Sequence, residues 1–276
     1  MAQMLNILAS IMQKQVPRCM LCPNQATDVI LMQTNWQDRY EAFCHKRILN
    51  LSVQEKMMAY KAVLFDYDGT LTDRTKSAYT GFKLVLKQYF PQLDEHDPVF
   101  EGMMQQCILW DEYGTIGKKT VMERVKDHWL PDLDIDQAVK QWYEVFPDCQ
   151  FWTEGMPETI KALKEKYKVG MVTNGPHDRQ WPKIHKMQME GMFDPIIVSG
   201  DFGKKKPDPS IYQAAADYLH VSCEECIYVG DTFHTDIVGA INAHMRPVWF
   251  CAERAGVSDL DVEIVRSAKE LADLLL

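Results

Sequence analysis

Long hydrophobic runs and an excess of basic residues are both missing from this chain of 276 residues. No apolar run approaches the roughly 20 residues that a membrane-spanning helix needs, so we expect no membrane partner. Lys and Arg number 30 against 39 Asp and Glu, and the resulting net charge of −9 disfavours a nucleic acid polymer as partner. No repeat or low-complexity segment is present, and an apolar content of 46% suffices for a full core. Composition therefore predicts an ordinary globular protein.

Cysteine is too sparse to predict a disulfide framework. The eight cysteines are spread along a chain that is long enough to fold without staples. A secretory leader has a basic flank and a cleavage site, and the apolar stretch at residues 4–12 lacks both. We therefore expect a cytoplasmic protein with reduced thiols.

Short apolar runs alternate with amphipathic stretches from Lys61 onward. This alternation predicts an α/β fold with a Rossmann-like parallel sheet that helices cover on both faces. In such sheets, ligands bind in the loops at the carboxyl ends of the strands. The expected strands are residues 62–65, 169–173, 196–199, 227–229 and 247–250.

The long segment between the first two expected strands has helical periodicity, for example at residues 118–129. We interpret it as an inserted helical cap domain at residues 74–155. The α/β core then consists of residues 59–73 and 156–276, and residues 1–58 form an N-terminal extension.

An acidic loop follows the first expected strand, where residues 66–73 read DYDGTLTD. Asp66 and Asp68 are two positions apart, so strand alternation directs both side chains to the same side. Two carboxylates so close repel each other unless a cation lies between them, and Gly69 permits a sharp turn. The loop by itself predicts either a Mg²⁺ site or an ordinary Asp-rich turn.

Four segments of the chain together resemble the signatures of the haloacid dehalogenase superfamily. They are residues 65–71 (FDYDGTL), 171–175 (MVTNG), 204–209 (KKKPDP) and 228–236 (YVGDTFHTD). The segments occur in the order of the family, and each follows an expected strand. The resemblance covers about residues 58–276 and implies a Mg²⁺-dependent phosphohydrolase.

The resemblance implies a role for each carboxylate of the first signature. Asp66 is the nucleophile that takes the phosphoryl group, and Asp68 is the general acid and base. Both count among the expected metal ligands, Asp68 through its backbone carbonyl. The dehalogenases of the superfamily lack the second aspartate, so Asp68 favours phosphate esters as substrates. Phosphomutases keep it, and mutase activity remains an alternative.

The other signatures supply the groups that bind phosphate and metal. By resemblance, Thr173 and Asn174 hold the transferring phosphoryl group, the latter through its backbone amide, and Lys206 neutralises its oxygens. Asp231 is the second side-chain ligand of Mg²⁺. Asp236 is expected to act through metal-bound water.

A mobile cap would enclose its substrate, so we expect a small phosphorylated metabolite. Residues 173–180 (TNGPHDRQ) are similar to a branch with pyrimidine 5'-nucleotidases and sugar-phosphate phosphatases, and a nucleoside monophosphate ranks first. Residues 110–114 (WDEYG) are candidates for the leaving-group pocket, although such residues also serve as packing.

The N-terminal extension contains a pattern that resembles a zinc module. Cys19 and Cys22 have the spacing of a metal knuckle, and Cys44 with His45 supplies a second pair. Adjacent ligands in that second pair reach one metal only with strain. A Zn²⁺ site, a metal-free remnant and a disordered extension therefore all remain open. A further alternative is a binding or regulatory protein that recruits a protein partner through this module.

Overall fold

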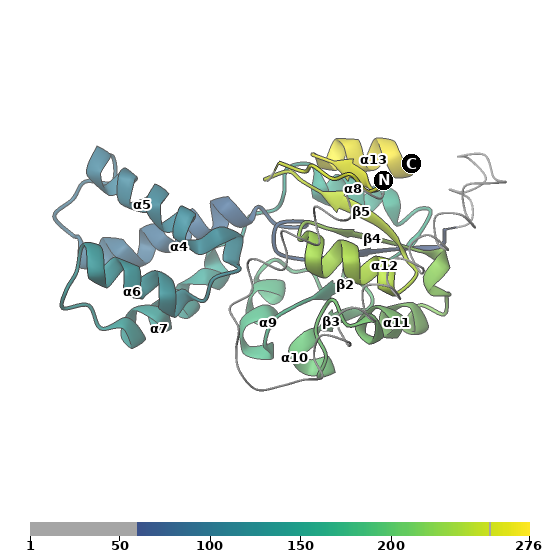
Figure 1. Ribbon diagram of the computed structural model, residues 1–276, viewed down its shortest axis with the longest axis horizontal. Helices are drawn as coiled ribbons and strands as arrows, with labels where there is room; N and C mark the ends of the chain where they lie inside the picture. The colour runs from purple at the N-terminus through teal and green to yellow at the C-terminus, as the bar shows by residue number, and fades with distance from the viewer. Residues whose placement is uncertain (1–59, 254) are drawn as a thin grey trace, which may run out of the picture. The chain divides into compact units, whose positions relative to one another are not determined.

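The computed structural model describes residues 60–253 and 255–276 (Figure 1). The predicted zinc ligands Cys19, Cys22, Cys44 and His45 lie outside the described residues. Within the described part of the chain, no helix is both long enough and apolar enough to cross a membrane.

The core of the fold is a parallel sheet in the order β3-β2-β1-β4-β5-β6, which confirms the predicted Rossmann-like α/β class. In this sheet β1 lies between β2 and β4, and Ala62 of β1 pairs with Lys168 on one side and Cys226 on the other. The sequence did not predict β6. The strands are β1 (Ala62–Phe65), β2 (Lys168–Thr173), β3 (Ile196–Val198), β4 (Cys226–Gly230), β5 (Arg246–Phe250) and β6 (Glu263–Val265).

Helices cover both faces of this sheet because its central strand is apolar throughout. All four residues of β1 are fully buried, and alternate side chains enter different clusters. Val63 packs in the cluster that includes residues of α8 and α13, whereas Leu64 packs in the cluster that includes residues of α11. The helical elements of the core are α8 (Met156–Leu163), α9 (His177–Lys186), α10 (Ser199–Phe202), α11 (Pro209–Tyr218), η3 (Cys223–Glu225), η4 (Phe233–Ile237), α12 (Val238–Asn242) and α13 (Ala268–Leu275).

The segment between β1 and β2 folds into helices that gather in one bundle (Figure 1). The bundle has its own apolar core, in which Trp142 packs against Phe82 with ring centroids 4.3 Å apart. Gly81 permits this packing, since a Cβ atom there would lie 3.0 Å from the Trp142 ring. The helical elements are α4 (Arg74–Tyr89), α5 (Pro98–Asp111), η1 (Glu112–Gly114), α6 (Lys118–His128), α7 (Ile135–Val145) and η2 (Phe146–Cys149).

Two carboxylates cap the amino end of α4, where the bundle begins. The Asp73 side chain accepts a hydrogen bond from the Lys76 amide at 2.8 Å. Glu253, just after β5, accepts from the amides of Arg74 at 2.6 Å and Thr75 at 3.0 Å, and from the Thr75 hydroxyl at 2.5 Å. Burial raises the pKa of Glu253. The segment after β5 thus fastens the first helix of the bundle to the core.

Candidate active site

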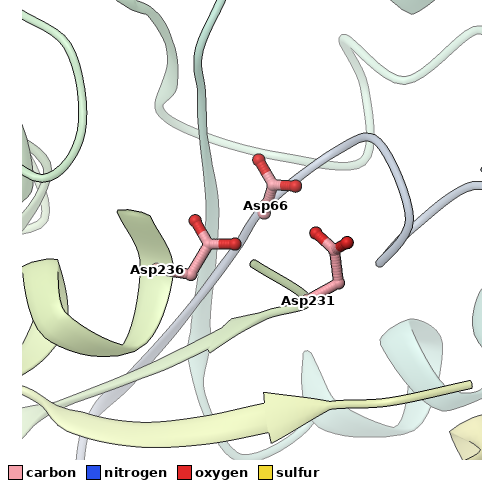
Figure 2. Close-up of side chains that lie close together, drawn as sticks. All are labelled: Asp66, Asp231 and Asp236. Atoms are coloured by element: carbon pink, nitrogen blue, oxygen red, sulfur yellow. The ribbon is translucent and has the colours of Figure 1, made fainter. Parts of the chain in front are cut away.

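Three buried carboxylates meet at the carboxyl ends of β1 and β4. Asp66 follows β1, Asp231 follows β4, and Asp236 lies on η4. One oxygen of each lies within 4.8 Å of the others, and Figure 2 shows the side chains projecting from these three segments to a common side. Gly230 permits the approach of η4, because a Cβ atom there would lie 2.4 Å from the Cβ atom of Asp236. The parallel pairing of β1 with β4 therefore assembles an acidic cluster.

Lys206 provides a buried positive charge to this cluster. Its Nζ atom lies 2.5 Å from Asp66 Oδ1, 2.7 Å from Asp236 Oδ1 and 2.9 Å from the Tyr228 hydroxyl. Burial opposes the charge, but the carboxylates of Asp236 and Asp66 outweigh it and raise the pKa of Lys206. Asn174 holds the backbone of Lys206, since its Oδ1 accepts from the Lys206 amide at 2.8 Å and its Nδ2 donates to the Lys206 carbonyl at 3.0 Å.

The composition of the cluster fits a divalent cation. Burial raises the pKa of Asp66 to about 7 even though Lys206 opposes this, and the charge of Asp236 adds to the shift. One ammonium group therefore does not compensate for three carboxylates. The ligand atoms that the cluster offers are carboxylate oxygens, and Mg²⁺ prefers oxygen ligands. Gly69 leaves room for the Asp231 carboxylate, because a Cβ atom there would lie 2.7 Å from Asp231 Oδ2.

The Asp68 carboxylate is bound by α9. Lys183 Nζ lies 2.8 Å and 2.6 Å from its two oxygens, and Gln180 Nε2 lies 3.2 Å from Oδ2. Burial opposes ionisation of Asp68, but the charges of Lys183 and Arg74 outweigh it and lower the pKa of the carboxyl group. The Asp68 side chain thus pairs with α9 and lies outside the cluster of three carboxylates, and metal ligation by its backbone carbonyl stays a prediction.

The second signature segment, residues 171–175, ends at the same carboxyl edge of the sheet as the acidic loop after β1. Thr173 is buried at the end of β2, and its hydroxyl accepts a hydrogen bond from Gln180 Nε2 at 2.6 Å. The next two residues are engaged with the backbone and side chains of the core: Asn174 holds Lys206, and the Gly175 amide donates to Ser199 Oγ at 3.0 Å. Gln180 therefore connects the predicted phosphate-binding hydroxyl with Asp68.

A cavity of about 1090 Å³ joins these groups to residues of the helical bundle. Of the predicted leaving-group segment, Tyr113 and Gly114 line this cavity, whereas the ring of Trp110 packs 5.1 Å from that of Trp129. Asp111 is buried and binds Arg74 and Lys118 of the bundle. The bundle and the core therefore share one cavity above the carboxylates.

Sequence reasoning assigned no role to Lys183 and Gln180. Their spacing of three residues on α9 was the available signal, because it places both side chains on the same face of the helix. His177 is exposed at the start of α9, and its Nδ1 lies 2.7 Å from Asp201 Oδ1.

Comparison with known proteins gives a family, relatives and a similar fold. A haloacid dehalogenase-like hydrolase family model matches residues 60–244. Glyceraldehyde 3-phosphate phosphatase of Pyrococcus abyssi is 31% identical over 69% of this chain and 81% of its own length. N-acylneuraminate-9-phosphatase of Rattus norvegicus is 27% identical over 78% of this chain and 93% of its own. The magnesium-bound HAD-hydrolase YfnB of Bacillus subtilis has a similar fold, with a TM-score of 0.63 and 20% identity over 78% of this chain and 98% of its own.

The fold, the acidic cluster and these likenesses define a class of protein. The chain belongs to the haloacid dehalogenase-like hydrolases. Within that family it is a phosphoric monoester hydrolase.

Proposed function

We propose that the protein is a Mg²⁺-dependent phosphatase that hydrolyses a small phosphorylated metabolite through a phosphoryl group carried on Asp66. The observation that supports this most is the buried cluster of Asp66, Asp231 and Asp236, in which Lys206 pairs with Asp66 and Asp236. A bound Mg²⁺ would be held by Asp66, Asp231 and the Asp68 carbonyl, and it would neutralise phosphoryl oxygens. Asp236 lies near enough to bind the same ion directly or through water.

In the first half of the reaction, an oxygen of Asp66 attacks phosphorus. The new bond from Asp66 to phosphorus forms as the bond from phosphorus to the ester oxygen breaks, and Asp68 gives its proton to the departing alkoxide. Burial opposes ionisation, but the charge of Lys183 outweighs it and lowers the pKa of Asp68, so Asp68 is a carboxylate before substrate binds. The proton that it gives to the alkoxide is one that it first takes from the monoanionic form of the phosphate ester. Lys183 therefore acts through Asp68.

In the second half, water attacks the phosphorus of the aspartyl-phosphate. Asp68, now a carboxylate, takes a proton from that water, and the bond from Asp66 to phosphorus breaks. Inorganic phosphate leaves, Asp68 releases the proton that it took from water, and both aspartates return to their starting states. Thr173 and Lys206 stand beside the reacting group, where a hydroxyl and an ammonium can balance the negative charge of the phosphoryl oxygens.

The shared cavity supports a small substrate. Its volume of about 1090 Å³ suits a metabolite, and its walls come from both the core and the bundle. We therefore propose that the bundle is a cap that reads the leaving group. Sugar phosphates and nucleoside monophosphates are the classes to compare first.

The function is tested with 4-nitrophenyl phosphate in Mg²⁺-containing buffer. The parent should release phosphate, and Asp66→Asn should be inactive because the amide is a poor nucleophile. Asp132→Asn serves as the matched control, since Asp132 is exposed. If Asp66→Asn hydrolyses the ester as fast as Asp132→Asn does, Asp66 is not the nucleophile. Transfer of phosphate to a second sugar hydroxyl, with no free phosphate, would instead indicate a phosphomutase.

A further inference from the structure

The cap contains a buried ion cluster that the proposed chemistry does not use. Arg74, at the start of α4, and Lys118, at the start of α6, both bind Asp111 at the end of α5. Arg74 Nη2 lies 2.8 Å from Asp111 Oδ2, and Lys118 Nζ contacts Asp111 Oδ1. Arg74 is 5% exposed, Lys118 is 6% and Asp111 is 1%. Two cations thus share one carboxylate away from water.

The cluster is short of negative charge. One carboxylate balances only one of the two cations, and an uncompensated buried charge is unfavourable. Burial, together with the nearby charge of Arg74, lowers the pKa of Lys118 to about 8 even though Asp111 opposes this. Asp68 also acts on both cations, but its own carboxylate is engaged by Lys183. The cluster would gain from a second anion.

An unpaired hydrogen-bond donor of Arg74 also indicates that the cluster would gain from a second anion. Among the described residues, no group accepts a hydrogen bond from its buried Nη1. The guanidinium is held in place by neighbours, because its Cζ lies 5.1 Å from the centre of the Phe146 ring and a Cβ atom at Gly114 would lie 2.7 Å from Nη2. A buried donor without a partner costs free energy unless a ligand supplies an acceptor.

The amino end of α6 lies beside the same cations. Its N-cap residue is Gly117, which offers no side chain to the first amides of this 11-residue helix. Gly117 and Lys118 line the cavity together with Arg74. The dipole of α6 adds to the positive charge of the two side chains. Arg74, Lys118 and this helix end therefore form a positive wall on the cap side of the cavity.

We propose that this wall is a subsite for a second anionic group, a carboxylate or a phosphate, on the leaving group of the substrate. The inference rests on the proposed function, because it places the phosphoryl group at Asp66 and the remainder of the substrate against the cap. Arg74 offers its unpaired Nη1, Lys118 adds a compact charge, and Asp111 fixes both. The substrate class is then phosphomonoesters with an acidic leaving group.

Matched ligands test the proposal. Glycerol 3-phosphate and 3-phosphoglycerate differ in a hydroxymethyl group against a carboxylate, and fructose 6-phosphate and fructose 1,6-bisphosphate differ in a second phosphate. We expect kcat/KM to be at least tenfold higher for the acidic member of one pair, and the pair that shows it identifies the group. Equal values within both pairs would overturn the inference while leaving the phosphatase function in place.

Variants connect the preference to the residues. Arg74→Met and Lys118→Met should each lower the ratio of kcat/KM within the preferred pair at least tenfold, whereas Lys119→Met should keep it, since Lys119 is exposed on the same turn and does not line the cavity. Arg74→Lys, which keeps the charge, should restore part of the ratio and covers the case in which Arg74→Met does not fold. An unaltered ratio in Arg74→Lys and Lys118→Met would contradict the proposal.

Binding measurements test the anion subsite separately from the proposed nucleophile Asp66. Calorimetric titration of Asp66→Asn with each pair measures affinity without turnover, and the acidic member should bind at least tenfold more tightly. No difference in affinity would overturn the subsite even if the parent is an active phosphatase. Hydrolysis by Asp66→Asn would overturn the proposed nucleophile, and a tenfold difference in affinity would still support the subsite.

Discussion

The side-chain amine of Lys206 bridges Asp66 and Asp236, with distances of 2.5 Å and 2.7 Å to their carboxylate oxygens. The three side chains come from three separate segments at the carboxyl edge of the sheet, and all are at least nine-tenths buried. Their charges depend on one another, because removal of the ammonium leaves two carboxylates together in a site of low polarity.

We therefore expect Lys206→Met to lose both activity and stability. Without a counter-charge for Asp66, kcat should fall by about 100-fold or more, and without metal the free energy of unfolding should fall by about 3 kcal/mol. Denaturant titration in chelator measures the second effect. The control is Lys205→Met, which removes an exposed neighbouring charge. Equal stability of the two variants would show that the bridge does not stabilise the fold.

Removal of metal should destabilise the parent, because the carboxylates of Asp66, Asp231 and Asp236 then repel one another. At Mg²⁺ concentrations about 100 times the dissociation constant, the unfolding free energy should rise by about 2.7 kcal/mol over its value in EDTA. Asp231→Asn should lose most of this increase, and Asp132→Asn should keep it. Thermal unfolding with and without Mg²⁺ checks the difference. The same increase in both variants would place the cation elsewhere.

Asp68→Asn should discriminate between leaving groups, because only a poor leaving group needs a proton from Asp68. For glycerol 3-phosphate, the first-turnover rate should fall by roughly 10² to 10⁴-fold, as expected for loss of a general acid. For 2,4-dinitrophenyl phosphate, rapid release of one equivalent of dinitrophenolate should persist in stopped-flow measurements, followed by slow turnover. Equal first-turnover losses for both esters would assign Asp68 a structural role instead.

The buried Lys118 predicts a pH dependence of stability. Its pKa is lowered from 10.5 to about 8 in the folded protein, so between these pH values the unfolded chain holds a proton that the folded chain has released. The stability of the parent should therefore rise relative to Lys118→Met as pH increases from 8 to 10.5, by up to roughly 3 kcal/mol. Denaturant titrations of both proteins across this range measure the difference. A constant difference would mean that Lys118 keeps an ordinary pKa.

Glu253→Gln should loosen the amino end of α4, since the carboxylate accepts hydrogen bonds from the Arg74 amide and from the amide and hydroxyl of Thr75. We expect a loss of about 1 kcal/mol, and faster hydrogen exchange at the first amides of the helix. Glu154→Gln, at an exposed position, is the control. Unchanged exchange at Arg74 and Thr75 would show that Asp73 alone holds the helix.

The sheet was predictable from sequence because its central strands are strongly patterned. The apolar run of β1 ends in an acidic loop, the four signature segments accompany β1, β2, β3 and β4, and the apolar run at residues 247–250 indicated β5. β6 (Glu263–Val265) was not predicted, since three residues with one exposed Glu are too few to show a period.

The site was only partly predictable from sequence, because local patterns reveal residues that follow strands but not contacts between separate helices. Asp66 and Asp231 follow strands, so sequence alone indicated that they meet. Asp236 was expected to act through metal-bound water, and this stays a prediction; η4 places its carboxylate in the cluster because Gly230 permits the approach. Arg74 and Asp111 are 37 positions apart on different helices, and their contact arises from packing that no local pattern encodes.

The central position of β1 has a consequence for how the chain folds during synthesis. β1 leaves the ribosome before either of its neighbours, and its second neighbour, β4, follows more than 150 residues later. The helices of the bundle between β1 and β2, whose contacts are more local, can pack on one another well before that. Until β4 emerges, β1 exposes apolar side chains and unpaired backbone groups, and Asp66 lacks its partners. The newly made chain is therefore most exposed to aggregation between the completion of the helical bundle and the arrival of β4.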